Sequence, residues 1–181
     1  KSALENVKQG NLGQGGSTLT MQMIDVSHMS KLEKAPNGFV RIARKVQEIF
    51  LSMQAESHIS KQQILEKYLN LINFGGPARG IQKGAQYYFG KDVSQVTLSE
   101  AAFLAGVINA PNGFDPYYNY DAAIERRNET LDLMLYHGYI TEEEHELAAN
   151  TELAFQLSGP IVFETSPYLS YIYKVREEII E

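Results

Sequence analysis

Hydroxyl, amide and glycine residues gather near the start of the sequence at a spacing that suits phosphate binding. From Gly15 to Thr20, two glycines are followed by Ser17 and Thr18, and these residues open a predicted helix. Free backbone N–H groups and the helix dipole attract phosphate at such a place. Gln22 lies one turn into the helix, where its amide can face the same site. A plain glycine turn with a Ser or Thr N-cap explains the same residues without any ligand.

A second segment places two arginines, a lysine and a glutamate together. Arg41, Arg44 and Glu48 are separated by three and four residues, so they share one helix face, and Lys45 lies alongside. This arrangement is suited to binding a diphosphate, with Glu48 held ionised by its basic neighbours. The alternative is an exposed ladder of ion pairs, each worth roughly a few tenths of a kcal/mol.

Other reactive patterns are missing from the sequence. There are no cysteines, and the four histidines share no metal-ligand spacing, so we predict no metal site. Neither a Ser-His-Asp pattern nor a Walker-type phosphate loop occurs. Glu66 lies in a helix rich in core residues, where a structural hydrogen bond or ion pair is its simpler role. The residues alone therefore predict a helical domain with a candidate anion site.

Length and charge narrow the class of protein. The 181 residues suffice for one domain with a small additional lobe. The net charge of -6, with no long block of like charge, argues against nucleic-acid binding. No apolar run approaches the roughly 20 residues that span a bilayer. The residues at Lys1 resemble the middle of a longer protein, so we expect any membrane anchor to lie upstream.

Helical periodicity dominates the elements that must position these groups. Apolar residues recur at helical spacing from Val40 to Met53, and a second helix is predicted from Ser60 to Ile72. Ser60, Thr97 and Thr141 each precede Gln or Glu by three residues, which predicts three capping boxes. Asp121 is predicted to cap a helix that ends near Tyr136 and is closed by Gly138. Loops are predicted at 9–16, 35–38, 73–80 and 110–119, and an extended segment at 160–163. The expected fold is mainly α.

A series of ordered motifs resembles glycosyltransferase family 51, the peptidoglycan transglycosylase domains of class A penicillin-binding proteins and their monofunctional relatives. The resemblance spans roughly residues 1 to 150. It rests on the following segments: Gly15 to Gln22, Arg44 to Glu48, Ile64 to Asn70, Tyr88 to Lys91, Leu98 to Gly106 and Arg126 to Asn128. Ser166 to Leu169 is similar to the exit toward the linker of the bifunctional proteins. We therefore expect a glycosyltransferase domain at 1–158 and a segment at 159–181 that leads to a linker or transpeptidase domain.

The resemblance implies a lysozyme-like helical large lobe and a smaller membrane-facing jaw, here expected near residues 21–39. It implies polymerisation of lipid II into glycan strands by inverting transfer, with release of undecaprenyl diphosphate. Glu48 matches the family's carboxylate beside the diphosphate, and it is our catalytic candidate. The family's substrate-binding residues match these positions: Ser17, Thr18, Gln22, Arg41, Arg44 and Lys45.

The resemblance also implies the setting of the reaction. The partners would be lipid II, the growing glycan strand and moenomycin-type inhibitors. The expected location is the extracytoplasmic face of the bacterial cell membrane. A divalent cation, Mg²⁺ or Mn²⁺, would fit beside the diphosphate, although no dedicated metal cage is recognisable in the sequence.

The sequence departs from the family pattern in two places. The family's first motif, which carries the general base, would lie upstream of Lys1, so we expect the printed residues alone to be nearly inactive in polymerisation. Asp25 stands where the family places a cation, and Met21 replaces a glutamine. We hypothesise that Lys31, Lys34 or Arg41 supplies the charge. A non-catalytic module that binds lipid II or a divisome partner, and a lysozyme-like glycan hydrolase, remain as alternatives.

Overall fold

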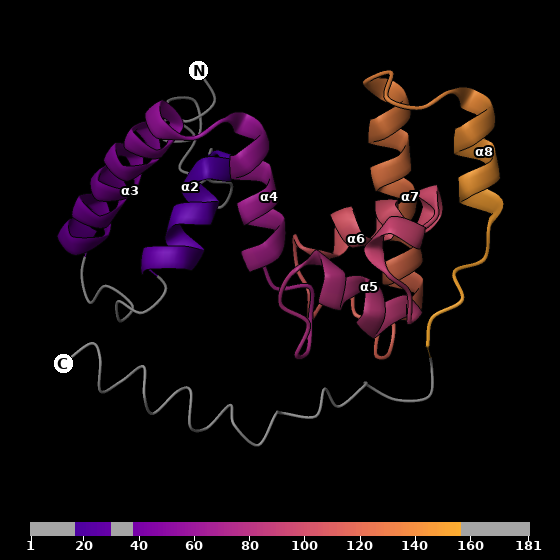
Figure 1. Ribbon diagram of the computed structural model, residues 1–181. Coiled ribbons are helices and arrows are strands. Elements are labelled where there is room, and N and C mark those ends of the chain that lie inside the picture. Colours follow the sequence, from indigo (N-terminus) through magenta and orange to yellow (C-terminus); the bar gives the residue numbers. More distant parts are fainter. Residues whose placement is uncertain (1–16, 30–37, 157–181) are drawn as a thin grey trace. The chain divides into compact units, whose positions relative to one another are not determined.

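The computed structural model describes residues 17–29 and 38–156, and within these residues the secondary structure is helical (Figure 1). The prediction of a mainly α fold is confirmed. The described residues divide into two compact units at the boundary between Ile72 and Asn73. Across both described ranges, every helix is either too short or too polar to cross a lipid bilayer.

The first unit places the short helix α2 against two longer helices, α3 and α4 (Figure 1). Its elements are α2 (Leu19–Ile24), the π-helical turn η1 (Asp25–Met29), α3 (Gly38–His58) and α4 (Lys61–Leu71). The Thr20 hydroxyl donates a hydrogen bond of 2.6 Å to Glu56 of α3. On the other side, the buried Tyr68 of α4 donates one of 3.0 Å to the Gln22 side chain. These two bonds fix the position of α2, and with it that of Ser17 just upstream.

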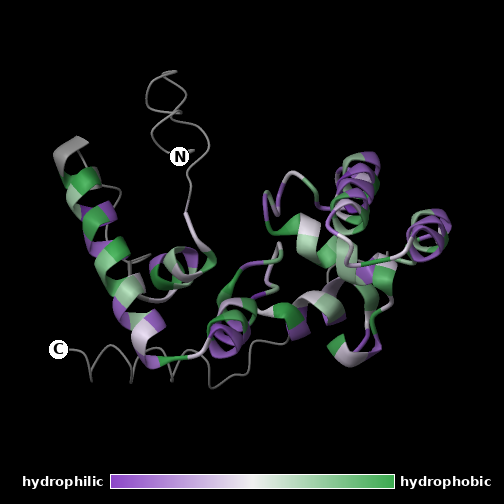
Figure 2. Ribbon diagram, turned by 90° about the horizontal axis from the view of Figure 1, so that it is seen from above, coloured by the Kyte–Doolittle hydropathy of each residue, from purple (hydrophilic) through white to green (hydrophobic). Residues whose placement is uncertain are grey.

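Helix α3 buries polar residues and exposes an apolar stripe. Glu48 and Ser52 are only 7% and 5% exposed, and the Ser52 hydroxyl donates to the Glu48 carbonyl at 2.7 Å. Four apolar residues whose spacing predicted the helix are 61% to 68% exposed: Ile42, Val46, Phe50 and Met53. Figure 2 shows the hydrophobic colour recurring along α3. The helix is confirmed and is longer than predicted, but the buried face is the one that carries Glu48.

The second unit is built around helices α6 and α7, which pack against each other, with α8 against α7 and α5 against α6. Its elements are α5 (Ile81–Phe89), the 3-10 turn η2 (Val93–Gln95), α6 (Leu98–Val107), α7 (Tyr120–Tyr136) and α8 (Glu142–Asn150). One small core joins Ala102, Leu131 and Ala148. A second, aromatic core includes Tyr88 and Phe103, whose ring centroids lie 4.9 Å apart. The predicted loops at 73–80 and 110–119 lie outside the helices of this unit.

The predicted helix caps are largely confirmed. All three capping boxes form, with Ser60, Thr97 and Thr141 as N-caps. Gly138 closes α7 at a φ of +71°, a left-handed conformation that glycine adopts without steric cost. The prediction for Asp121 is wrong. Helix α7 starts two residues earlier than predicted, Asn119 is its N-cap, and Asp121 lies in the first turn, where its charge still favours the helix dipole.

Some predictions fall outside the described residues. These are the loop at 9–16, most of the loop at 35–38, the extended segment at 160–163, the helix from Ser166, and the C-terminal segment 159–181. Residues 21–29 of the expected jaw are helical. Its contact with a membrane stays a prediction, as does the boundary of a domain at 1–158.

A buried carboxylate in the loop before α7 should make the stability of the protein depend on pH. Asp115 is only 4% exposed, and burial raises its pKa, opposed by a hydrogen bond of 3.0 Å from the Tyr117 backbone N–H. A raised pKa in the folded state means that this group's contribution to stability is full below 3.8 and is lost as the pH rises through the folded-state value.

We therefore expect Asp115→Asn to increase the free energy of unfolding at neutral pH and to change it little in acid. The asparagine keeps an acceptor for the Tyr117 N–H but never ionises. Urea unfolding of both proteins, from acid to neutral pH, measures the difference in their free energy of unfolding. A difference that is constant with pH, or larger in acid, would show that ionisation of Asp115 does not oppose folding.

Candidate functional site

The residues just before α2 form a local cap. The Thr18 hydroxyl accepts a hydrogen bond of 3.2 Å from the Met21 N–H, and the Thr18 N–H donates to the Met21 sulfur at 3.4 Å. Met21, which departs from the family pattern, thereby completes the capping box that Gln would ordinarily form. The Ser or Thr N-cap weighed in the sequence is Thr18, and phosphate binding at this turn stays a prediction. Gly15 and Gly16 lie outside the described residues.

Lys45 connects the hydroxyl-rich segment at Ser17 with the charged segment that contains Glu48. Its ammonium group donates to the Ser17 hydroxyl at 2.6 Å and to the Glu48 carboxylate at 2.8 Å. Ser17 and Lys45 are 28 residues apart, so this contact depends on the packing of α2 against α3. The Lys45 side chain is 44% exposed, whereas that of Glu48 is 9% exposed. The ammonium group therefore links a buried carboxylate to a hydroxyl near the surface.

Arg44 has a different partner from the one expected. It forms an ion pair with Asp25, the first residue of the π-helical turn after α2, and their side chains are 28% and 43% exposed. The sequence identified Asp25 as a residue in the place of a cation, but it did not predict this pairing. Because Glu48 instead pairs with Lys45, the predicted face of α3 carries two ion pairs with different partners. The Arg41 side chain, Lys31 and Lys34 lie outside the described residues, so the hypothesis about them stays a prediction.

Gln22 lies on the side of α2 that meets α4. Its side-chain oxygen accepts from Tyr68, whose hydroxyl is buried, and this burial raises the tyrosine pKa. Sequence analysis did not identify Tyr68 as a partner. The signal was present, because a tyrosine on the buried face of a helix ordinarily needs a hydrogen-bond partner for its hydroxyl group.

We call Ser17, Asp25, Arg44, Lys45 and Glu48 the ionic cluster.

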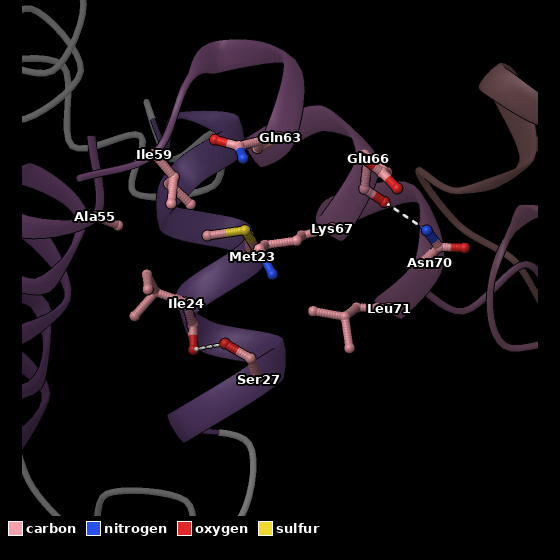
Figure 3. Close-up of a pocket in the computed structure, with 10 residues that line it drawn as sticks. All are labelled: Met23, Ile24, Ser27, Ala55, Ile59, Gln63, Glu66, Lys67, Asn70 and Leu71. Carbon is pink, nitrogen blue, oxygen red and sulfur yellow. Dashed lines mark hydrogen bonds between the residues drawn. The ribbon is translucent and has the colours of Figure 1, made fainter. Parts of the chain in front are cut away.

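A cavity of the first unit is separate from the ionic cluster. It has a volume of about 650 Å³ and lies between α2, the end of α3 and α4 (Figure 3). Met23, Ile24 and Leu71 contribute apolar walls, and Glu66 and Lys67 contribute charge. None of the ionic-cluster residues lines it. The ionic cluster is the candidate functional site, because cations and a buried carboxylate meet there.

Metal binding by protein groups alone has no support in the described ranges. Within residues 17–29 and 38–156, no three His, Asp or Glu side chains are close enough together to hold a metal ion. What the ionic cluster can do chemically is provide two cations beside a hydroxyl and a buried carboxylate. Groups of this kind bind phosphoryl oxygens and stabilise negative charge that develops on them.

Comparisons with known proteins point to one family. The chain is 38% identical over 174 residues to penicillin-binding protein 1A of Escherichia coli strain K12, an alignment that covers 94% of this chain and 19% of that protein. It is 36% identical over 180 residues to penicillin-binding protein 1A of Streptococcus oralis, covering 99% of this chain and 27% of the relative. The chain thus spans about a fifth to a quarter of the length of these relatives.

A solved structure and a family model agree with these relatives. The crystal structure of penicillin-binding protein 1A from Haemophilus influenzae matches with a TM-score of 0.53 and 37% identity, covering 67% of this chain and 18% of that one. The family model described as Transglycosylase matches residues 1–135. Since this match includes most of the chain, and with it the segments that form the ionic cluster, the chain belongs to the transglycosylase family.

Proposed function

We propose that the chain is the glycosyltransferase part of a cell-wall polymerase that joins lipid II units into glycan strands. The observation that carries this proposal is the bridge made by Lys45. Its ammonium group contacts Ser17 at 2.6 Å and Glu48 at 2.8 Å, and so links the Ser17 segment to the Glu48 segment, two of the motifs of the resemblance. Membership of the transglycosylase family supports the same reaction class.

The proposed reaction exchanges one bond at an anomeric carbon. The 4-hydroxyl of the acceptor's N-acetylglucosamine attacks C1 of the donor's N-acetylmuramic acid, and the bond from C1 to the diphosphate oxygen breaks. The bonding electrons leave with undecaprenyl diphosphate, and the hydroxyl proton passes to a general base. By the resemblance, this base belongs to the first motif, upstream of Lys1.

In this proposal the ionic cluster acts on the leaving group. Lys45 and Arg44 would stabilise the charge that develops on the diphosphate, because fixed cations at the place where charge appears lower the barrier most. Glu48 is the carboxylate beside the diphosphate, and its ion pair with Lys45 holds that cation in place. Ser17, Thr18, Gln22 and Arg41 would line the donor site. These roles follow the motif positions.

The setting of the reaction is part of the proposal. The donor is lipid-linked, so the site would work at the extracytoplasmic face of the bacterial membrane, and moenomycin-type inhibitors would compete for it. A divalent cation, if one takes part, would bind beside the diphosphate, since the described residues offer no cluster that could hold it alone.

The product of the reaction tests this function against its alternatives. A version of the chain extended upstream by the first motif is incubated with lipid II and, separately, with intact cell walls. We expect glycan strands from lipid II and no soluble muropeptides from cell walls. Muropeptides without strands would instead identify a glycan hydrolase. Lipid II binding without any product would identify a non-catalytic binding module.

A further inference from the structure

Asp25 pairs with Arg44, which is one of the two cations that the structure describes in the proposed donor site. It is the residue at which this chain departs from the family's charge pattern, and it forms an ion pair with Arg44 from the turn that follows α2. The neighbouring cation, Lys45, is paired with Glu48. In the ionic cluster, two positive charges are therefore balanced by two negative ones, and an incoming diphosphate does not meet a surplus of positive charge.

The two carboxylates differ in how readily they can move away. Glu48 has a side chain that is 9% exposed and is held within α3 beside its partner, three residues away. The Asp25 side chain is 43% exposed and its partner Arg44 is 28% exposed. An ion pair this close to solvent contributes little to the stability of a protein, so a ligand can separate it at small cost. A diphosphate offers Arg44 two or more oxygens and more charge than one carboxylate.

We propose that Asp25 sets the affinity of the donor site: it holds Arg44 in the absence of ligand and is displaced when a diphosphate binds. This inference rests on the proposed function, since it assigns Arg44 to the diphosphate. Asp25 lowers the affinity in two ways. It must release Arg44, and its own charge then remains near the bound anion and repels it.

A double-mutant cycle with inorganic pyrophosphate as the probe tests this directly. The full 181-residue chain, Asp25→Asn, Arg44→Gln and the double variant are titrated by calorimetry. Neutralising one charge a few ångströms from a multiply charged ion should tighten binding about tenfold in Asp25→Asn. Arg44→Gln should weaken binding only a few-fold in the unmodified chain, because Arg44 is already occupied there. In the Asp25→Asn background it should weaken binding more strongly, because it removes the part of the gain that comes from the release of Arg44.

The matched control is Asp121→Asn, which changes the net charge by the same amount at an exposed position on α7. It should leave pyrophosphate affinity unchanged. Circular dichroism of each variant confirms that the helices are intact, and the exposure of Asp25 makes the isosteric change tolerable.

Three outcomes would overturn the proposal. Weaker binding by Asp25→Asn would mean that Asp25 orients Arg44 for the ligand. An equal gain from Asp25→Asn with and without Arg44 would mean that Asp25 does not act through Arg44. Equal affinity of Asp25→Asn and the unmodified chain would mean that the ion pair has no influence; in these three cases the anion site of the proposed function survives. If neither chain binds pyrophosphate, both this inference and that anion site fail.

Discussion

Replacing Arg127 with methionine is expected to lower the free energy of unfolding by about 3–5 kcal/mol, because several buried acceptors lose a charged donor and each costs about 1–3 kcal/mol when left unsatisfied. Arg127 is 3% exposed. Its guanidinium donates to the Ser99 hydroxyl at 2.5 Å and to the carbonyls of Ala148, Ala149 and Thr151 at 2.8 to 3.1 Å. These carbonyls lie at the negative end of the α8 dipole, so the cation both satisfies and neutralises that end of the helix.

Urea unfolding of the variant measures this loss of unfolding free energy, and two further variants serve as comparisons. Arg127→Lys keeps the charge but donates from a single point, so its loss should be intermediate. Arg126→Met removes a neighbouring arginine that is paired with the exposed Glu129, and it should cost clearly less. If Arg127→Met lost less than about 1 kcal/mol, the α8 carbonyls would have to find other donors, and the network would not hold α8 to α6 and α7.

Replacing Lys45 with methionine is expected to reduce glycan polymerisation by about 10²–10³-fold, the usual loss when one preorganised group that stabilises transition-state charge is removed. The methionine side chain keeps the length of the lysine stem but cannot bond to Ser17 or Glu48. The measurement is the initial rate of strand formation from lipid II by the version extended upstream of Lys1.

The matched control for this variant is Lys61→Met, at an exposed position in the first turn of α4. Its rate should be close to that of the unmodified protein, and thermal unfolding of both variants checks the fold. Lys45→Arg should recover part of the rate, because it restores the charge with a different geometry. A rate in Lys45→Met within a factor of about three of the control would exclude Lys45 from the leaving-group site.

The helices and their ends were predictable because their signals are local. Ser60, Thr97 and Thr141 each contact the backbone three residues ahead, so the pattern in the sequence already contains both partners. The prediction of Asp121 as N-cap was wrong because several polar residues near the start of α7 are adequate N-cap candidates. There the structure uses Asn119, and boundaries within one or two residues are seldom determined by a pattern alone.

The contacts of the site were less predictable because they join distant residues. Spacing placed Arg44, Lys45 and Glu48 together on α3, but it carries no information on what packs against that helix. The bridge from Lys45 to Ser17 and the pair of Arg44 with Asp25 both depend on how α2 crosses α3. The same limit explains the apolar stripe of α3. Periodicity identifies a helix face, but the neighbouring elements decide whether that face is buried.

The role of Glu48 in glycosyl transfer is tested by the rate of lipid II polymerisation by Glu48→Gln, in the version extended upstream of Lys1. The change is isosteric and removes only the charge that pairs with Lys45; Glu143→Gln, at an exposed position on α8, is its control. We predict strand formation that is normal in the control and reduced by at least about 10²-fold in Glu48→Gln, with both proteins folded. Equal rates in the two variants would mean that the ionic cluster takes no part in glycosyl transfer.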